Sequence, residues 1–130
     1  MRRSFEGVEP QIADSAYVDD AAVVIGDVIV EDAASIWPNT TVRGDHGQIV
    51  VGAGTNVQDN AVLHEGVELG RDVTVGHSAI VHGAIVAGTP AEPKRPIDDP
   101  QLEATAERYI ELATRYEDAS DCLDRTDDAP

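Results

Sequence analysis

Histidines are the residues of this sequence best suited to chemistry, and three of them have an informative spacing. His64 and His82 lie 18 residues apart, and His77 lies between them. Imidazole nitrogens are preferred zinc ligands, and a site with three of them keeps a fourth tetrahedral position open, which is typical of catalytic zinc. The trio therefore suggests a metal site, provided that the fold brings the rings together.

The fold is indicated by an aliphatic side chain at every sixth residue, in two runs over residues 12–42 and 51–81. A strict hexad repeat predicts a solenoid of very short parallel strands, a β-helix. The fourth residue after each aliphatic is small or β-branched almost throughout, as a narrow solenoid core requires. The runs are nine residues apart, from Val42 to Val51, and the three extra residues predict an outward loop within residues 43–48.

This repeat predicts where the histidines lie in space. If three hexads make one coil, His82 stands above His64, about 4.8 Å away, and Arg43 stands one coil below. His77 falls on the preceding side of the coil, above Gln58, from which it should not easily reach the other two histidines of its own chain. It could reach those of a neighbouring chain. We therefore expect a metal site between subunits, which a cyclic homotrimer would close.

The composition is strongly acidic. Nine Lys and Arg residues stand against 25 Asp and Glu residues, for a formal net charge of −16, so nucleic acid and anionic lipid are poor partners. Two explanations are open: a disordered polyanion-like chain, or a folded protein from a salt-saturated cytoplasm that screens self-repulsion. The ordered repeat favours the second, and we expect a halophilic source. Because no segment reads as a signal peptide or a membrane span, we expect a cytoplasmic protein.

Three regions follow one another along the chain. Residues 1–96 are predicted to form the β-helix domain with a proline-rich exit, and residues 97–118 a C-terminal α-helix that packs on the β-helix. Asp99 is the expected N-cap and Pro100 the first helical residue. The side chains expected to face the solenoid share one helical stripe: Leu102, Ala106, Tyr109, Ile110, Ala113 and Tyr116. Residues 119–130 read as a disordered acidic tail.

Three motifs together resemble the gamma-class carbonic anhydrases. They are Arg43-Gly44-Asp45, Asn56-Val57-Gln58-Asp59, and His-x12-His-x4-His at His64, His77 and His82. The resemblance implies a mainly β protein, a left-handed parallel β-helix of about four coils followed by a C-terminal helix. It also implies a homotrimer with an intersubunit Zn²⁺, or Fe²⁺ or Co²⁺ in some members, held by the three histidines.

The same resemblance implies roles for other residues. The family hydrates CO₂ reversibly to bicarbonate through metal-bound hydroxide. Gln58 resembles the glutamine that orients this hydroxide, and Asn56 resembles a polar residue lining the pocket. Arg43 and Asp45 resemble a pair that bridges subunits near the site, and we favour an interface role for them over a catalytic one. His46 follows the Arg-Gly-Asp motif where some members carry a proton-moving Glu, so it is a possible proton shuttle.

The sequence departs from the family pattern in ways that leave function open. Only Glu65-Gly66 separates His64 from the next strand, where active members carry an acidic loop. About two coils expected after the third histidine are missing, with the join near residues 84–85. Weak or absent hydratase activity is therefore expected. The alternatives are a non-catalytic trimeric metal-binding or scaffold protein, as a natural or engineered deletion variant, and, less favoured, a hexapeptide-repeat acyltransferase.

Overall fold

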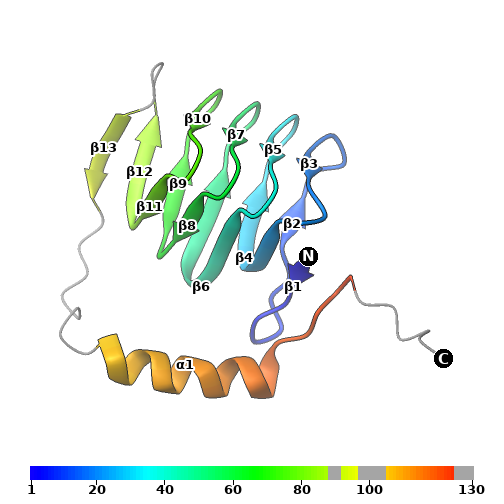
Figure 1. Ribbon diagram of the computed structural model, residues 1–130, viewed down its shortest axis with the longest axis vertical. Helices are drawn as coiled ribbons and strands as arrows, with labels where there is room; N and C mark the ends of the chain where they lie inside the picture. Colours follow the sequence, from blue (N-terminus) through cyan, green and yellow to red (C-terminus); the bar gives the residue numbers. More distant parts are fainter. Residues whose placement is uncertain (88–91, 97–104, 125–130) are drawn as a thin grey trace.

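The computed structural model describes residues 1–87, 92–96 and 105–124. It is a left-handed parallel β-helix followed by one α-helix in the described part of the chain, as the hexad repeat and the resemblance predicted (Figure 1). Residues 18 apart pair on successive coils, for example Tyr17 with Ser35 and Val62 with Ile80. Three hexads therefore make one coil.

The solenoid has three faces, which we name by their order along a coil. The first face contains β1 (Arg2–Arg3), β8 (Val62–His64), β11 (Ile80–His82) and the first halves of β4 (Val23–Val30) and β6 (Thr41–Val51). The second face contains the second halves of β4 and β6 with β2 (Gln11–Ile12), β9 (Val67–Leu69) and β12 (Ala84–Ala87). The third face contains β3 (Tyr17–Val18), β5 (Ser35–Ile36), β7 (Asn56–Val57) and β10 (Thr74–Val75).

The core is the stack of hexad side chains inside this prism. Val24, Val42 and Leu63 are successive rungs of the first face, and each is fully buried. The small hexad positions are buried beside them, as at Ala22 and Ala61. Burying an aliphatic side chain of this size contributes about 1.5–3 kcal/mol, so the repeated rungs supply most of the driving force for winding the chain.

The enlarged hexad differs from the expected outward loop. β6 runs without interruption from Thr41 to Val51, and the extra residues appear as a register shift: Gly26 pairs with Gly44, but Val28 pairs with Ile49. Asp45 is buried at this corner instead of projecting into solvent. The expectation of an outward loop was therefore wrong for Asp45, because its carboxylate has partners inside the chain.

The last coil is shorter than the repeat predicts. Ile85 was expected to occupy a small inward position, but it pairs with Glu68, an exposed residue, and Val86 pairs with Leu69 in the core column. Val86 follows Leu69 by 17 positions, one fewer than the 18 of a full coil. β13 (Glu92–Pro96) then pairs antiparallel to β12 and covers its outer edge. An open parallel edge is an aggregation hazard, and this hairpin covers the edge of the second face at the end of the solenoid.

The helix α1 (Thr105–Ala119) crosses outside the strands, with its C-terminal end next to β1 (Figure 1). Leu112 is buried against Phe5 and Ile25, and Tyr116 packs on the same cluster. Ile110 is 72% exposed and Ala113 is also exposed, so the predicted stripe was wrong for both. The helix is rotated because Leu112 and Tyr116, one turn apart, fit the apolar patch of the first face. Asp99, Pro100 and Leu102 lie outside the described residues, as do the side chains of Ala106 and Tyr109.

Residues 119–124, the beginning of the expected disordered tail, are ordered and contact the N-terminal residues. Ser4 donates its backbone N–H to the carbonyl of Asp121 at 3.0 Å, and Leu123 donates to the carbonyl of Arg2 at 2.9 Å. Arg2 also pairs with Asp124, with Nε and Oδ1 3.0 Å apart. The expectation of disorder from residue 119 onward was therefore wrong for residues 119–124, and residues 125–130 lie outside the described part. Within that part, no helix has both the length and the apolar character needed to cross a membrane.

Candidate metal centre

One column of the first face carries the polar residues of interest. Ile25 pairs with Arg43, Arg43 with His64, and His64 with His82, each on the next coil. The expected stacking of Arg43, His64 and His82 is thus confirmed. The two imidazoles meet edge to face, with their ring centroids 5.4 Å apart. Their exposure differs, because His64 is buried and His82 is about half exposed.

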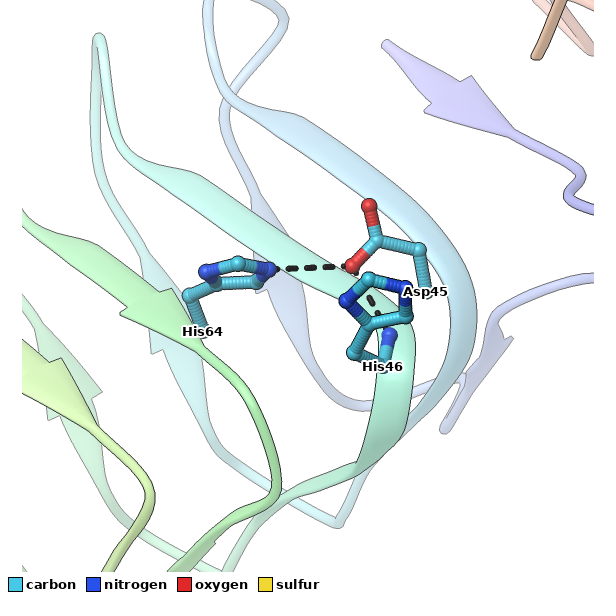
Figure 2. Close-up of side chains that lie close together, drawn as sticks. All are labelled: Asp45, His46 and His64. Atoms are coloured by element: carbon cyan, nitrogen blue, oxygen red, sulfur yellow. Dashed lines mark hydrogen bonds and ion pairs between the residues drawn. The ribbon is translucent and has the colours of Figure 1, made fainter. Parts of the chain in front are cut away.

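Asp45 organises the buried end of this column. Its Oδ1 lies 3.0 Å from Nε2 of His64 and accepts the backbone N–H of His46 at 2.8 Å (Figure 2). Its Oδ2 accepts the hydroxyl of Tyr116 at 2.8 Å and lies 3.3 Å from Nε of Arg43. Because an ionised carboxylate only accepts hydrogen bonds, Nε2 of His64 carries the proton and Nδ1 carries the lone pair. Nδ1 lies 3.2 Å from Nη2 of Arg43, which donates to it.

The pKa values of this network follow from its contacts. Burial by itself raises the pKa of Asp45, but the hydrogen bonds from His64 and Tyr116 and the charge of Arg43 outweigh it, and the pKa falls below its ordinary value. The pKa of Tyr116 is raised, first by burial and then by its hydrogen bond to Asp45. Asp45 is therefore a carboxylate, and Tyr116 a neutral hydroxyl, throughout the physiological range.

Glu65 extends the site toward solvent at the corner after β8. Its Oε2 lies 3.7 Å from Nε2 of His82, and its Oε1 lies 3.7 Å from Nδ1 of His46. Two donor sets in the described part of the chain have one ligand atom per residue within 4.8 Å of the others. One set is Asp45, His46 and His64, and the other is His64, Glu65 and His82. Imidazole and carboxylate donors of this kind suit Zn²⁺ and related divalent metals.

His77 lies elsewhere in the chain, just after β10 on the third face. Its side chain is 68% exposed, and its Nδ1 lies 3.6 Å from Oδ1 of Asp59. It lines an open pocket of about 510 Å³ with Trp37, Asn56 and Gln58 among the other lining residues. Gln58 donates from Nε2 to Oδ1 of Asn56 at 3.2 Å, so the two amides are held side by side.

Comparison with known proteins places these motifs in a family context. No family model matches the chain. A protein named carbonic anhydrase from Geobacillus kaustophilus is 44% identical over 86 residues, which are 63% of this chain and 47% of that protein. Protein YrdA of Escherichia coli K12 is 38% identical over 95 residues, which are 65% of this chain and 52% of that protein. The resemblance to the gamma-class carbonic anhydrase family is confirmed.

The match is partial in length. The chain spans about half the length of these curated relatives. Among solved structures, serine acetyltransferase from Brucella abortus has a TM-score of 0.50 at 17% identity, covering 68% of this chain and 40% of that chain. At this identity the likeness shows the β-helix fold alone.

The resemblance predicted a residue set that one chain only partly brings together. His64 and His82 meet, with Arg43, Asp45 and His46 around them, whereas His77, Gln58 and Asn56 share a different face. Arg43 and Asp45 pair with each other in one chain, and their interface role stays a prediction. Sequence reasoning missed Tyr116 and Glu65 as site residues. The position of Glu65, directly after His64 at a two-residue corner, was the available signal for it. Nothing in the sequence links Tyr116 to Asp45.

Proposed function

We propose that this chain is a gamma-type carbonic anhydrase-like zinc protein that assembles as a homotrimer and hydrates CO₂ reversibly to bicarbonate. The observation that carries this proposal is the division of the three histidines between two faces. His64 and His82 stand together on the first face, whereas His77 is exposed on the third face beside Gln58 and Asn56.

This division favours a site built between copies of the chain. A contact between the first face of one copy and the third face of the next is heterologous, and three such contacts about a threefold axis close a ring. The partner's His77 would then approach His64 and His82. Gln58 and Asn56 of the same partner would come with it, because they line one pocket with His77.

The residues present fit a divalent metal. Metal-binding histidines commonly donate their second ring N–H to a carboxylate, which fixes the tautomer and the ring orientation. His64 has this arrangement with Asp45, and its Nδ1 keeps the lone pair. His64 and His82, with the partner's His77, would hold the zinc, and Fe²⁺ and Co²⁺ have the same donor preferences. When bound, the metal would supply Lewis-acid activation of water near neutral pH.

The chain's own residues then have distinct tasks. Asp45 holds the ring of His64 in place through the bond to Nε2. The Gln58 amide, oriented by its bond to Asn56, would position the attacking water by hydrogen bonding. His46, whose side chain is 20% exposed next to Glu65, would receive the released proton at Nδ1 and pass it to solvent. This is the proton-shuttle role that the sequence suggested.

The second candidate is a trimeric metal-binding or scaffold protein without hydratase activity. Two observations favour it. The chain spans about half of its curated relatives, and Arg43 donates to the Nδ1 lone pair of His64 that a metal would need. An acyltransferase function has only the shared fold in its favour.

Two measurements test the proposal. Metal analysis of purified protein in concentrated salt, which screens the charge of −16, should find zinc at about one ion per chain in the wild type and none in His64→Ala. Stopped-flow CO₂ hydration should then be faster for the wild type than for His64→Ala. Equal CO₂ hydration rates for the two proteins, with zinc bound to the wild type, would favour the non-catalytic scaffold over the enzyme. A monomer in concentrated salt would overturn the intersubunit site.

A further inference from the structure

We propose that Glu65 completes a three-ligand metal site with His64 and His82 inside a single chain, so that one protomer holds a divalent transition metal before a partner contributes. This inference rests on the metal site of the proposed function and adds a ligand to it. It also changes the order of events, because metal loading would precede assembly.

The donor atoms of these three residues already converge. One ligand atom from each lies within 4.8 Å of the others, and Oε2 of Glu65 is 3.7 Å from Nε2 of His82. In a tetrahedral site with bonds of about 2.0–2.1 Å, neighbouring ligand atoms lie about 3.4 Å apart. The Glu65–His82 separation therefore needs a shift of only a few tenths of an ångström to share one ion.

The corner that carries Glu65 is held by its neighbours. β8 ends at His64 and β9 begins at Val67, so the carboxylate comes directly from the end of the histidine strand. Glu65 and Gly66 both have left-handed backbone conformations, with φ of 65° and 70°. The corner below comes so close that a Cβ on Gly47 would lie 3.1 Å from Cα of Gly66. Such packing holds the backbone of the corner, and the Glu65 side chain that leaves it is only 12% exposed.

The alternative donor set, Asp45 with His46 and His64, is less suited to a metal. Both oxygens of Asp45 are engaged inside the chain, one by His64 and the backbone of His46 and the other by Tyr116 and Arg43. Using Asp45 as a ligand would break these bonds in a fully buried place. Glu65 and His82 meet at the side of the column that opens to solvent, since the His82 side chain is 47% exposed. A cation there would displace only the Arg43 bond to Nδ1 of His64 and would leave the bonds of Asp45 in place.

The additional ligand has a chemical consequence. Two imidazoles and a carboxylate are a donor set that zinc proteins use, and the carboxylate offsets one of the two metal charges. If the partner's His77 then joins, four protein ligands close the coordination sphere. A closed tetrahedral sphere is typical of structural zinc, so Glu65 would favour metal-linked assembly over catalysis.

The test is a Co²⁺ titration of the full chain, read by visible absorption and by equilibrium dialysis. The variants are Glu65→Gln, His77→Ala and the double variant. Glu68→Gln is the matched control, because it removes the same charge from an exposed position on the neighbouring strand. Far-UV circular dichroism confirms that each variant is folded. Glu65→Gln should weaken Co²⁺ binding at least about tenfold relative to Glu68→Gln. Losing a metal ligand lowers the affinity by at least as much as losing a residue that hydrogen-bonds to a ligand.

The His77 arm separates this inference from the proposed function. His77→Ala should bind Co²⁺ more weakly but still at one ion per chain, and the double variant should lose binding. Equal affinity of Glu65→Gln and Glu68→Gln would overturn the role of Glu65 and leave the intersubunit site standing. Loss of all binding in His77→Ala would overturn the single-chain site in the same way. Unchanged affinity in His77→Ala would support the single-chain site and overturn the intersubunit one.

Discussion

The hydroxyl of Tyr116 links the C-terminal helix to the candidate metal centre. It donates to Oδ2 of Asp45 at 2.8 Å, while the Tyr116 ring packs on Phe5 with centroids 4.8 Å apart. Tyr116→Phe removes the hydroxyl and keeps the ring contact. The change therefore isolates one hydrogen bond between residues that are 71 positions apart.

The expected magnitude follows from the charge and burial of the acceptor. A hydrogen bond to a charged group contributes about 1.5–3 kcal/mol, and Asp45 keeps Arg43 and His64 as partners, so we expect a loss near 2 kcal/mol. For a chain of 130 residues, the unfolding entropy converts this into a fall in melting temperature of about 7 °C. Tyr17→Phe is the matched control. Its hydroxyl also donates to a carboxylate, Asp19, at 2.7 Å, but at the surface, so the change should be much smaller.

The effect should depend on pH in a direction fixed by Asp45. Its pKa in the folded protein is below the ordinary 3.8, so its stabilising contribution is complete above about pH 4 and is lost as the pH falls through the folded pKa. Removing the Tyr116 hydroxyl moves that pKa back up. The difference in stability between the wild type and Tyr116→Phe should therefore be constant near neutral pH and shrink below about pH 4.

This difference in stability is measured by urea unfolding, followed by circular dichroism, at several pH values from 7 to 3. The protein concentration is kept fixed because assembly shifts the apparent stability. A loss below about 0.5 kcal/mol, as expected for an ordinary surface change, would refute the reasoning. So would a difference that is the same at pH 7 and pH 3, because the hydrogen bond would then not depend on the charge of Asp45.

Three further predictions concern the solenoid and its metal. Gly52→Ala should lower the free energy of unfolding by about 1–3 kcal/mol, because the new Cβ would clash with the carbonyl oxygen of Gly70. Gly76→Ala is the control and should be close to neutral, because nothing lies within 4 Å of its Cβ. Equal melting temperatures for the two would contradict this. Leu63→Ala should lose about 2–5 kcal/mol in urea unfolding, whereas Ile80→Ala, at a site 74% exposed, should lose much less. A chelator should lower the melting temperature of metal-loaded protein, and a temperature independent of added metal would contradict binding to the folded state.

The hexad pattern was enough to predict the core and the histidine column. Each rung is specified locally, because a hydrophobic side chain every six residues must turn inward wherever the chain winds in 18-residue coils. Val42, Leu63, His64 and His82 therefore lie where the spacing put them. The hexad spacing wrongly predicted that Ile85 turns inward. The last corner is one residue shorter, so Val86 occupies the core column instead.

The sequence by itself determined the coil, its three faces and the neighbours of each rung, since these depend on covalent spacing. Only the tertiary structure decided the inward turn of Asp45, the rotation of α1 and the meeting of Glu65 with His82. Those features depend on how corners and a distant helix fit together. A buried carboxylate is stable only where several donors reach it at once, and here they come from β6, β8 and α1.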